Sequence, residues 1–194
     1  MDNCARVMYL FMVRCVRNQV GFNSLATAVL LFMLLTSAAL CAEDRVVFSI
    51  YARIQFSVPP DWLVISSKSD TTNTVFAFQI PNPAEEGTPD STNLVIVASD
   101  LKQPGAKAAF EKKASNPEEK AQKRKLVDHW GCSSFSATQG STEYEIWDCF
   151  RTVTDCGVYV RVAWPHLPKN PPEYDKTMET RLAQVLNSVA PSVK

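Results

Sequence analysis

A short turn between two alternating segments is the feature that most constrains this sequence. Gly140 and Ser141 form a two-residue hairpin turn with glycine first, and residues alternate in character on both sides of it. Folding the chain about this turn pairs Cys132 with Cys149. Counted outward from the turn, the two cysteines occupy a non-hydrogen-bonded pair, where opposing side chains approach closely enough for a disulfide. The pattern therefore predicts an antiparallel hairpin closed by a Cys132–Cys149 bridge.

A third cysteine, Cys156, lies in a turn that is predicted to follow the hairpin. In an extended chain, Cys156 would lie about 20 Å from Cys149 along the strand direction. In this register it is therefore too far from both members of the pair to form a disulfide with either. We expect Cys156 to be a free thiol, or to be joined to Cys41 if that residue stays in the mature protein.

Alternation with a period of two predicts further strands on both sides of the hairpin. These strands cover residues 46–50, 54–58, 74–80 and 158–164. The segment from Leu94 to Ala98 is almost wholly apolar, which predicts a strand buried on both faces. Prolines and glutamates between 81 and 90 predict an exposed loop.

Two regions have helical spacing. From Tyr174 to Val189, apolar residues recur every three or four positions after a capping sequence that begins at Asn170. The charged region 104–127 has a thinner apolar stripe, and a second short helix is predicted there from Pro117 onward. Strands in hairpin succession with one helical region in the middle and one at the end predict an α+β domain, an antiparallel sheet with helices packed on it.

The order of these elements, with the segment Phe56–Trp62 reading Phe-Ser-Val-Pro-Pro-Asp-Trp after an opening strand, resembles the PsbP-like family. That family includes photosystem II accessory proteins and related bacterial exported proteins and lipoproteins, and a Ran-binding nuclear import factor shares its fold. The resemblance covers residues 46–190. It implies an α/β/α sandwich and an accessory or binding role without catalysis.

The N-terminal part of the sequence has the order of an export signal. Three arginines stand against one aspartate, and an apolar run of 18 residues, Leu25–Ala42, then ends in small residues before Glu43. The run is shorter than the about 20 residues of a typical transmembrane helix, so cleavage is favoured over retention in the membrane. We expect residues 1–42 to be a signal peptide or a membrane segment, and residues 43–194 to form one exported domain, periplasmic or secreted.

The charge of the predicted domain limits its partners. Without residues 1–42 it has 17 basic and 19 acidic residues, a formal charge of about −2, which favours neither nucleic acid nor an anionic membrane as partner. Contact with a membrane is expected only if the N-terminal segment is retained. Locally, seven basic residues stand against three acidic ones between 107 and 125, which predicts a solvated helix face or a docking surface for an acidic partner.

The hairpin carries the candidate binding residues. The side chains that share the face of the cystine are Ser134, Ser136, Thr138, Glu143, Glu145 and Trp147. Alternation of this kind is what a half-exposed antiparallel strand requires, so a solvated face is the favoured interpretation. The alternative is a polar binding surface, in which paired carboxylates could do acid–base work.

The two histidines predict no catalytic or metal site. His129 and Cys132 have a spacing that a metal could use, but a zinc site needs three or four ligands and the cysteine is assigned to the bridge. His166 lies in a proline-rich connection and is expected to be a solvated loop residue. We therefore predict no catalytic residue, no metal and no cofactor.

These observations favour an exported, non-catalytic binding or accessory protein. Its expected partner is another envelope or extracellular protein, or a small ligand. The alternative is a small periplasmic or extracellular enzyme that uses the polar face of the hairpin.

Overall fold

The structure is a computed structural model, and it describes residues 46–51, 53–82, 84 and 92–192. The chain divides into two compact units, Met1–Glu43 and Asp44–Lys194, and the described residues belong to the second. The predicted export segment and most of the predicted loop at 81–90 lie outside the described residues. Within the described part, no helix is both long enough and apolar enough to cross a bilayer.

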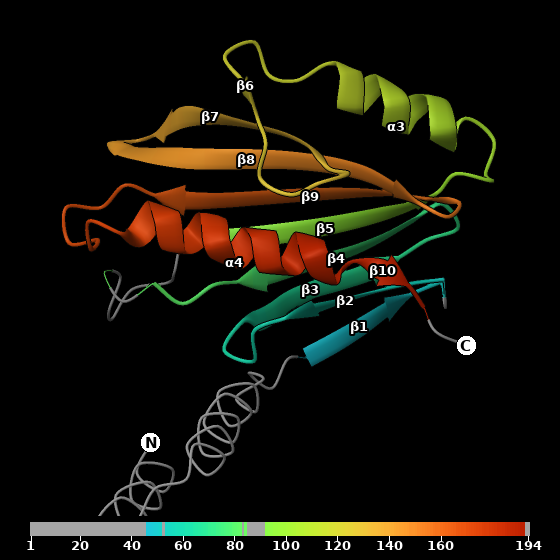
Figure 1. Ribbon diagram of the computed structural model, residues 1–194, viewed down its shortest axis with the longest axis horizontal. Helices are drawn as coiled ribbons and strands as arrows, with labels where there is room; N and C mark the ends of the chain where they lie inside the picture. The colour runs from blue at the N-terminus through green and yellow to red at the C-terminus, as the bar shows by residue number, and fades with distance from the viewer. Residues whose placement is uncertain (1–45, 52, 83, 85–91, 193–194) are drawn as a thin grey trace, which may run out of the picture. The chain divides into compact units, whose positions relative to one another are not determined.

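Within the described residues, two antiparallel sheets and two helices make up the fold, which confirms the α+β class (Figure 1). The main sheet has seven strands in the order β3-β4-β5-β9-β8-β7-β6, and a smaller sheet has the order β1-β2-β10. The elements are β1 (Val46–Ile50), β2 (Ile54–Val58), β3 (Leu63–Ser69), β4 (Asn73–Gln79), β5 (Asn93–Asp100), α3 (Ala106–Ser115), β6 (Gln122–Arg124), β7 (Gly131–Gln139), β8 (Thr142–Val153), β9 (Cys156–Pro165), α4 (Tyr174–Ser188) and β10 (Ala190–Pro191).

The β7–β8 hairpin has the predicted register and the predicted bridge. Gln139 pairs with Thr142 beside the turn, and Cys132 pairs with Cys149 seven positions farther along each strand. The two cysteines form a disulfide, with their Cα atoms 4.2 Å apart. That short separation is typical of a non-hydrogen-bonded pair. Cys156 is buried and forms no disulfide with any described residue, whereas Cys41 lies outside the described residues.

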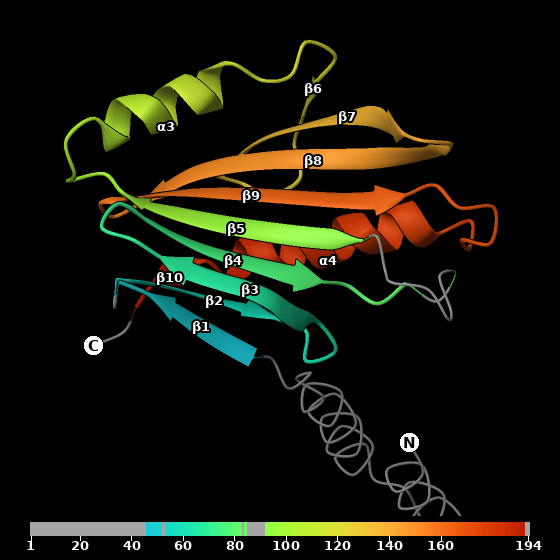
Figure 2. The same cartoon turned by 180° about the vertical axis from the view of Figure 1, so that it is seen from behind.

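The core lies between the main sheet and α4. The predicted apolar stripe of α4 is buried, and it includes Met178 and Leu182. It packs with the face of the sheet that carries Val160, Val162 and Trp164, all of which are at most 1% exposed. The two views show this helix in front of the sheet and then behind it (Figures 1 and 2).

The smaller sheet extends the same core with aromatic rings. Phe48 of β1 and Phe56 of β2 stack with their centroids 5.2 Å apart. Both rings also contact Phe76 and Phe78 of β4 at 5.2 to 6.1 Å. The amide of Ser57 and the hydroxyl of Ser188, 2.9 Å apart, join β2 to the end of α4. The smaller sheet and α4 therefore close the same side of the main sheet.

The opposite face of the main sheet is only partly covered. In β5, Leu94 and Ile96 are fully buried, but Val95 and Val97 on the other face are only half-buried, so the prediction that this strand is buried on both faces is wrong. The reason is the size and position of α3, which buries only Ala106 completely. An apolar strand can therefore leave one face partly open when the covering helix is short.

The predicted helix from Pro117 onward is also wrong. Residues 116–121 contain no helix, and the chain continues into β6, where Lys123 pairs with Ser133 of β7. This segment has no apolar face that would hold a helix on the sheet, whereas β7 offers backbone groups at its free edge. Strands β3 and β10 were not predicted.

An ion pair ties the turn between β1 and β2 to the end of β5. The guanidinium of Arg53 donates two hydrogen bonds to the Asp100 carboxylate, at 3.0 and 2.8 Å. The backbone amide of Lys102 donates a third, at 3.2 Å. The hydrogen bonds from Arg53 are the largest cause that lowers the pKa of Asp100 to about 2.

Removing the centre of the α4 stripe should destabilise the whole domain. Leu182→Ala should lower the free energy of unfolding by about 2 to 5 kcal/mol, because a fully buried side chain is lost and a cavity is left. Lys176→Ala, at an exposed position of the same helix, should change it by less than about 0.5 kcal/mol. Urea denaturation measures both values, and similar losses for the two variants would mean that α4 is not packed as described.

The Asp100 carboxylate should make stability fall in acid. Its folded pKa of about 2 lies below its unfolded value of about 3.9, so its contribution is present above about pH 4 and is lost as the pH falls toward 2. The free energy of unfolding of Asp100→Asn should therefore depend less on pH between about 2 and 4 than that of the wild type. Asp155→Asn, which removes an exposed carboxylate paired with Lys102, is the control. Equal pH slopes for the wild type and Asp100→Asn in urea titrations would contradict this assignment.

Candidate functional site

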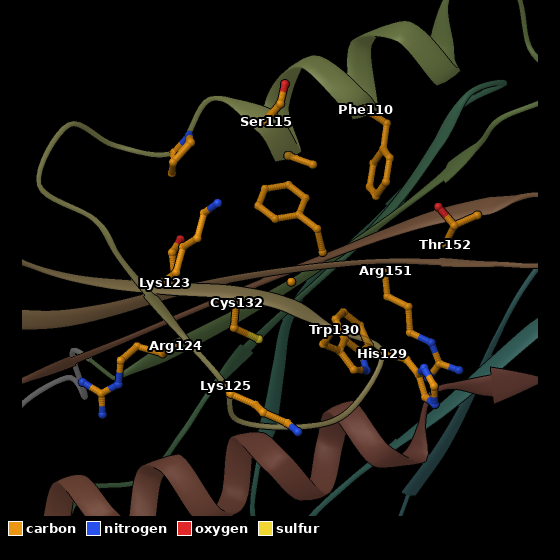
Figure 3. A pocket seen from close by; sticks show the side chains of 15 residues that line it. Phe110, Ser115, Lys123, Arg124, Lys125, His129, Trp130, Cys132, Arg151 and Thr152 are labelled. Carbon is orange, nitrogen blue, oxygen red and sulfur yellow. The ribbon is translucent and has the colours of Figure 1, made fainter.

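A cavity of about 910 Å³ lies at the β6 edge of the main sheet (Figure 3). Its walls come from α3, from β6 and the connection that follows it, and from β7 and β8. The lining residues are Phe110, Ala114, Ser115, Pro117, Lys123, Arg124, Lys125, His129, Trp130, Gly131, Cys132, Ser133, Phe150, Arg151 and Thr152. We call this cavity the edge pocket.

The edge pocket is basic. Four cationic side chains line it, and none of its lining residues is a carboxylate. The guanidinium of Arg124 forms an ion pair with the carboxylate of Glu179 of α4 at 3.3 Å, and Lys125 forms one with Asp128 at 2.9 Å. Lys123 has no ion-pair partner among the described residues, so its ammonium group is available to a ligand.

Aromatic rings supply the apolar part of the wall. Phe110 of α3 meets Phe150 of β8 edge to face, with centroids 5.9 Å apart. Trp130 is 7% exposed, and the guanidinium of Arg151 lies 6.0 Å from its ring centre. Figure 3 shows Phe110 on the α3 side of the strands and Trp130 and Arg151 on the α4 side. The pocket therefore offers both stacking surfaces and positive charge.

The position of α3 depends on a close contact with β9. A Cβ atom added to Gly157 would lie 2.7 Å from the Phe110 ring, so only glycine leaves room for this side chain. The ammonium of Lys113 lies 3.7 Å from the ring centre of Tyr159, which itself stacks on Phe150. Most other side chains of α3 are exposed, so Phe110 and Lys113 carry much of its contact with the sheet.

A buried carboxylate organises the sheet beneath α3. Asp148 accepts hydrogen bonds from the Tyr159 hydroxyl and from two nitrogens of Arg161, each at 2.7 Å. Burial, and next the hydrogen bond to Asp148, raise the pKa of Tyr159 above its usual value. Burial, and next the charge of Arg161, lower the pKa of Lys113. The network holds the aromatic floor under α3 in one arrangement.

One part of the predicted polar face of the hairpin is buried in the core, and the other part is exposed. Ser134 and Trp147 are 4% and 1% exposed, so the expectation of a solvated face is wrong for these two residues. Their face is the one that α4 covers. Nearer the turn the same face leaves the core, so that Ser136, Thr138 and Glu143 are exposed and Glu145 is half-buried. None of these six side chains lines the edge pocket.

His166 lies between two carboxylates from different elements. Its Nδ1 is 4.0 Å from Glu143 of β8, and its Nε2 is 3.6 Å from Asp175 of α4. Asp175 also accepts a hydrogen bond from the Trp164 indole N–H at 2.8 Å. His129 lines the edge pocket with a left-handed backbone, φ 67°. The described residues contain no group of three or more His, Cys, Asp or Glu side chains placed to hold a metal ion.

Most of the edge pocket was not predicted. The local excess of basic residues and the stripe residue Phe110 were visible signals in the sequence, and both belong to the pocket or its neighbourhood. Trp130, Phe150 and Arg151 were not identified, because their place in the wall depends on β6 returning to pair with β7.

Comparisons with known proteins add similarities of fold. No family model matches the chain, and no curated protein matches its sequence. A crystal structure from Bacteroides thetaiotaomicron is 13% identical with a TM-score of 0.49, and it covers 78% of this chain and 50% of its own, so the chain spans half the length of that protein. The Saccharomyces cerevisiae Ran-binding protein Mog1p is 12% identical over 76% of this chain and 95% of its own, with a TM-score of 0.46. A Mog1 mutant is 13% identical over 77% and 96%, also with a TM-score of 0.46. At this level of similarity, no site or partner passes from those proteins to this chain.

Gly157→Ala should loosen α3 and open the edge pocket. The new methyl group would displace Phe110, because the backbone of a central strand cannot move aside easily. Backbone amides of α3 should then exchange with deuterium faster than in the wild type. Gly131→Ala is the matched control, because its Cβ would meet only one carbonyl oxygen at an ordinary 3.9 Å. Unchanged exchange in α3 of Gly157→Ala would show that Phe110 does not hold the helix.

Proposed function

We propose that this protein is an exported, non-catalytic binding module, and that its edge pocket takes an acidic segment of a partner protein. The observation that carries this proposal is the composition of the pocket wall. Four cations and three aromatic rings line one cavity, and no carboxylate faces into it. Such a wall is complementary to a peptide that combines carboxylates with an apolar side chain.

Some of the cationic side chains in the pocket already form ion pairs with carboxylates of the protein, and others do not. Lys123 has no ion-pair partner among the described residues. Arg124 and Lys125 pair at the surface with Glu179 and Asp128, and exposed pairs of this kind are worth only about 0 to 1 kcal/mol. An incoming carboxylate can therefore replace these partners at little cost.

The charge distribution supports the same partner. The predicted domain is slightly acidic as a whole, but its basic residues gather along α3, β6 and the connection between them. A local positive field steers an acidic partner toward one edge of the sheet and sets its orientation. The aromatic rings then provide apolar contact area, which is a common source of binding energy at interfaces.

The disulfide supports export. Cys132–Cys149 lies inside the domain, and disulfides persist mainly in oxidising compartments outside the cytosol. Together with the export pattern before residue 43, this favours a partner that is itself an envelope or extracellular protein.

Charge reversal at Lys123 tests the proposal. The probe is a fluorescent synthetic peptide with several glutamates around one phenylalanine, and its binding is followed by fluorescence anisotropy. Lys123→Glu should weaken binding by about five- to thirtyfold, because an attraction of up to about 1 kcal/mol becomes a repulsion of similar size. Lys112→Glu, an equal charge change on α3 outside the pocket, should change the affinity by about twofold or less.

Two results would overturn the proposal. The first is an equal loss of binding in Lys123→Glu and Lys112→Glu, which would mean a diffuse charge effect without a site. The second is tighter binding of a single-stranded oligonucleotide than of the acidic peptide, which would assign the pocket to nucleic acid.

A further inference from the structure

The exposed large apolar side chains of the described residues gather in two strands. They are Val46, Val47, Leu63, Val64 and Ile65, with exposed fractions from 46% to 64%. The first two begin β1 and the other three begin β3. We call these five residues the corner patch. Scattered exposed apolar residues are ordinary, but a group of this kind marks an interaction surface.

The topology brings the two parts of the corner patch to the same end of the fold. Val46 pairs with Val58, the last residue of β2, and the turn that follows leads directly into Leu63. Figures 1 and 2 both show the start of β1 and the turn between β2 and β3 at the same edge. In addition, β3 is an edge strand of the main sheet, so its apolar residues border a free edge.

In the sequence, the corner patch begins only a few residues after the apolar segment. Only Glu43, Asp44 and Arg45 separate Ala42 from Val46, so the covalent chain limits that distance to about 14 Å. The headgroup layer of a bilayer is about 5 to 8 Å thick on each side. A membrane that held residues 25–42 would therefore lie within reach of the corner patch.

We propose that residues 25–42 stay in the bilayer and that the corner patch rests on the lipid surface of the same leaflet. This selects retention, the less favoured of the two outcomes that the sequence left open. The run Leu25–Ala42 has 18 residues, all apolar except Thr27, Thr36 and Ser37, and its length falls within the range of spanning helices. A second apolar contact next to such a segment fixes the orientation of the domain on the membrane.

This orientation leaves the edge pocket free. β3 and β6 are opposite edges of the seven-stranded sheet, and β8, the strand of the pocket wall nearest to β3, is four strand spacings, or about 19 Å, away from it. One edge therefore faces lipid while the other faces a partner. The proposal goes beyond the binding function, and either can fail without the other.

The charges beside the corner patch indicate which lipids it accepts. Asp61, which precedes β3, pairs with Arg181 at 3.5 Å, and Lys68 lies at the far end of β3. No cluster of basic side chains surrounds the patch within the described residues of β1 and β3. Contact should therefore depend on apolar area and be the same on zwitterionic and anionic bilayers.

Quenching of an added tryptophan by brominated lipid tests the proposal. The full chain is synthesised cell-free with phosphatidylcholine vesicles, with or without bromine on the acyl chains. Val64→Trp should lose its added emission in the brominated vesicles, whereas Lys68→Trp, about 13 Å farther along the same exposed strand, should not. The wild type supplies the background of the native tryptophans, and circular dichroism checks that both variants fold.

The outcomes separate the possible occupants of the patch. Quenching of Val64→Trp alone, equal with and without added phosphatidylglycerol, supports the lipid contact. Equal quenching of the two variants, or of neither, overturns it. An N-terminus at or after Leu40 in protein isolated from the native envelope overturns it as well. Concentration-dependent dimerisation that Val64→Asp abolishes would instead assign the patch to a second copy of the chain.

Discussion

The packing of α4 on one face of the main sheet is the interaction on which the rest of this structure depends. Met178 and Leu182 are buried against the face that carries Val162 and Trp164. This contact commits the part of the β7–β8 hairpin that carries the cystine and Trp147 to the core, so both contribute to stability. Because the core uses the part of that face that lies far from the turn, binding surfaces must come from the other face, from the turn end of the hairpin or from the edges of the sheet.

The β6 edge of the main sheet is also where the helix that covers the sheet is held by the fewest contacts. α3 touches the sheet through few side chains, chiefly Phe110 against Gly157 and Lys113 over Tyr159. Loosely packed elements open at lower free energy than a core helix does, and binding sites are often built from them. The rigid network around Asp148 supplies a fixed floor beneath a lightly held helix. This combination suits a pocket that has to admit an extended segment of a partner.

The two free edges of the main sheet differ in chemistry. At β3 the exposed apolar residues are Leu63, Val64 and Ile65, whereas β6 exposes Gln122, Lys123 and Arg124. Free edges invite pairing with other chains, and short or charged edge strands reduce that hazard. β6 has only three residues and carries two charges, which reduces the hazard there. The first three residues of β3 are apolar and uncharged, and its protection is limited to a register shift between Val64 and Ser66 and to Lys68 near its far end. An occupant at the β3 corner would therefore protect as well as orient the domain.

The hairpin, its register, the cystine and α4 could all be predicted from the amino-acid sequence, because each depends on residues close together in the chain. A two-residue turn sets the pairing of Cys132 with Cys149, and a 3.6-residue repeat identifies the buried stripe of α4. Three features depend on tertiary packing: which face of the hairpin is covered, the half-buried state of Val95 and Val97, and the pairing of residues 122–124 with β7 in place of a helix. Alternation shows which side chains share a face, but the element that covers that face comes from a distant part of the chain. The edge pocket was therefore beyond local patterns, since Lys123 and Arg151 line one cavity only after three strands and a helix have assembled.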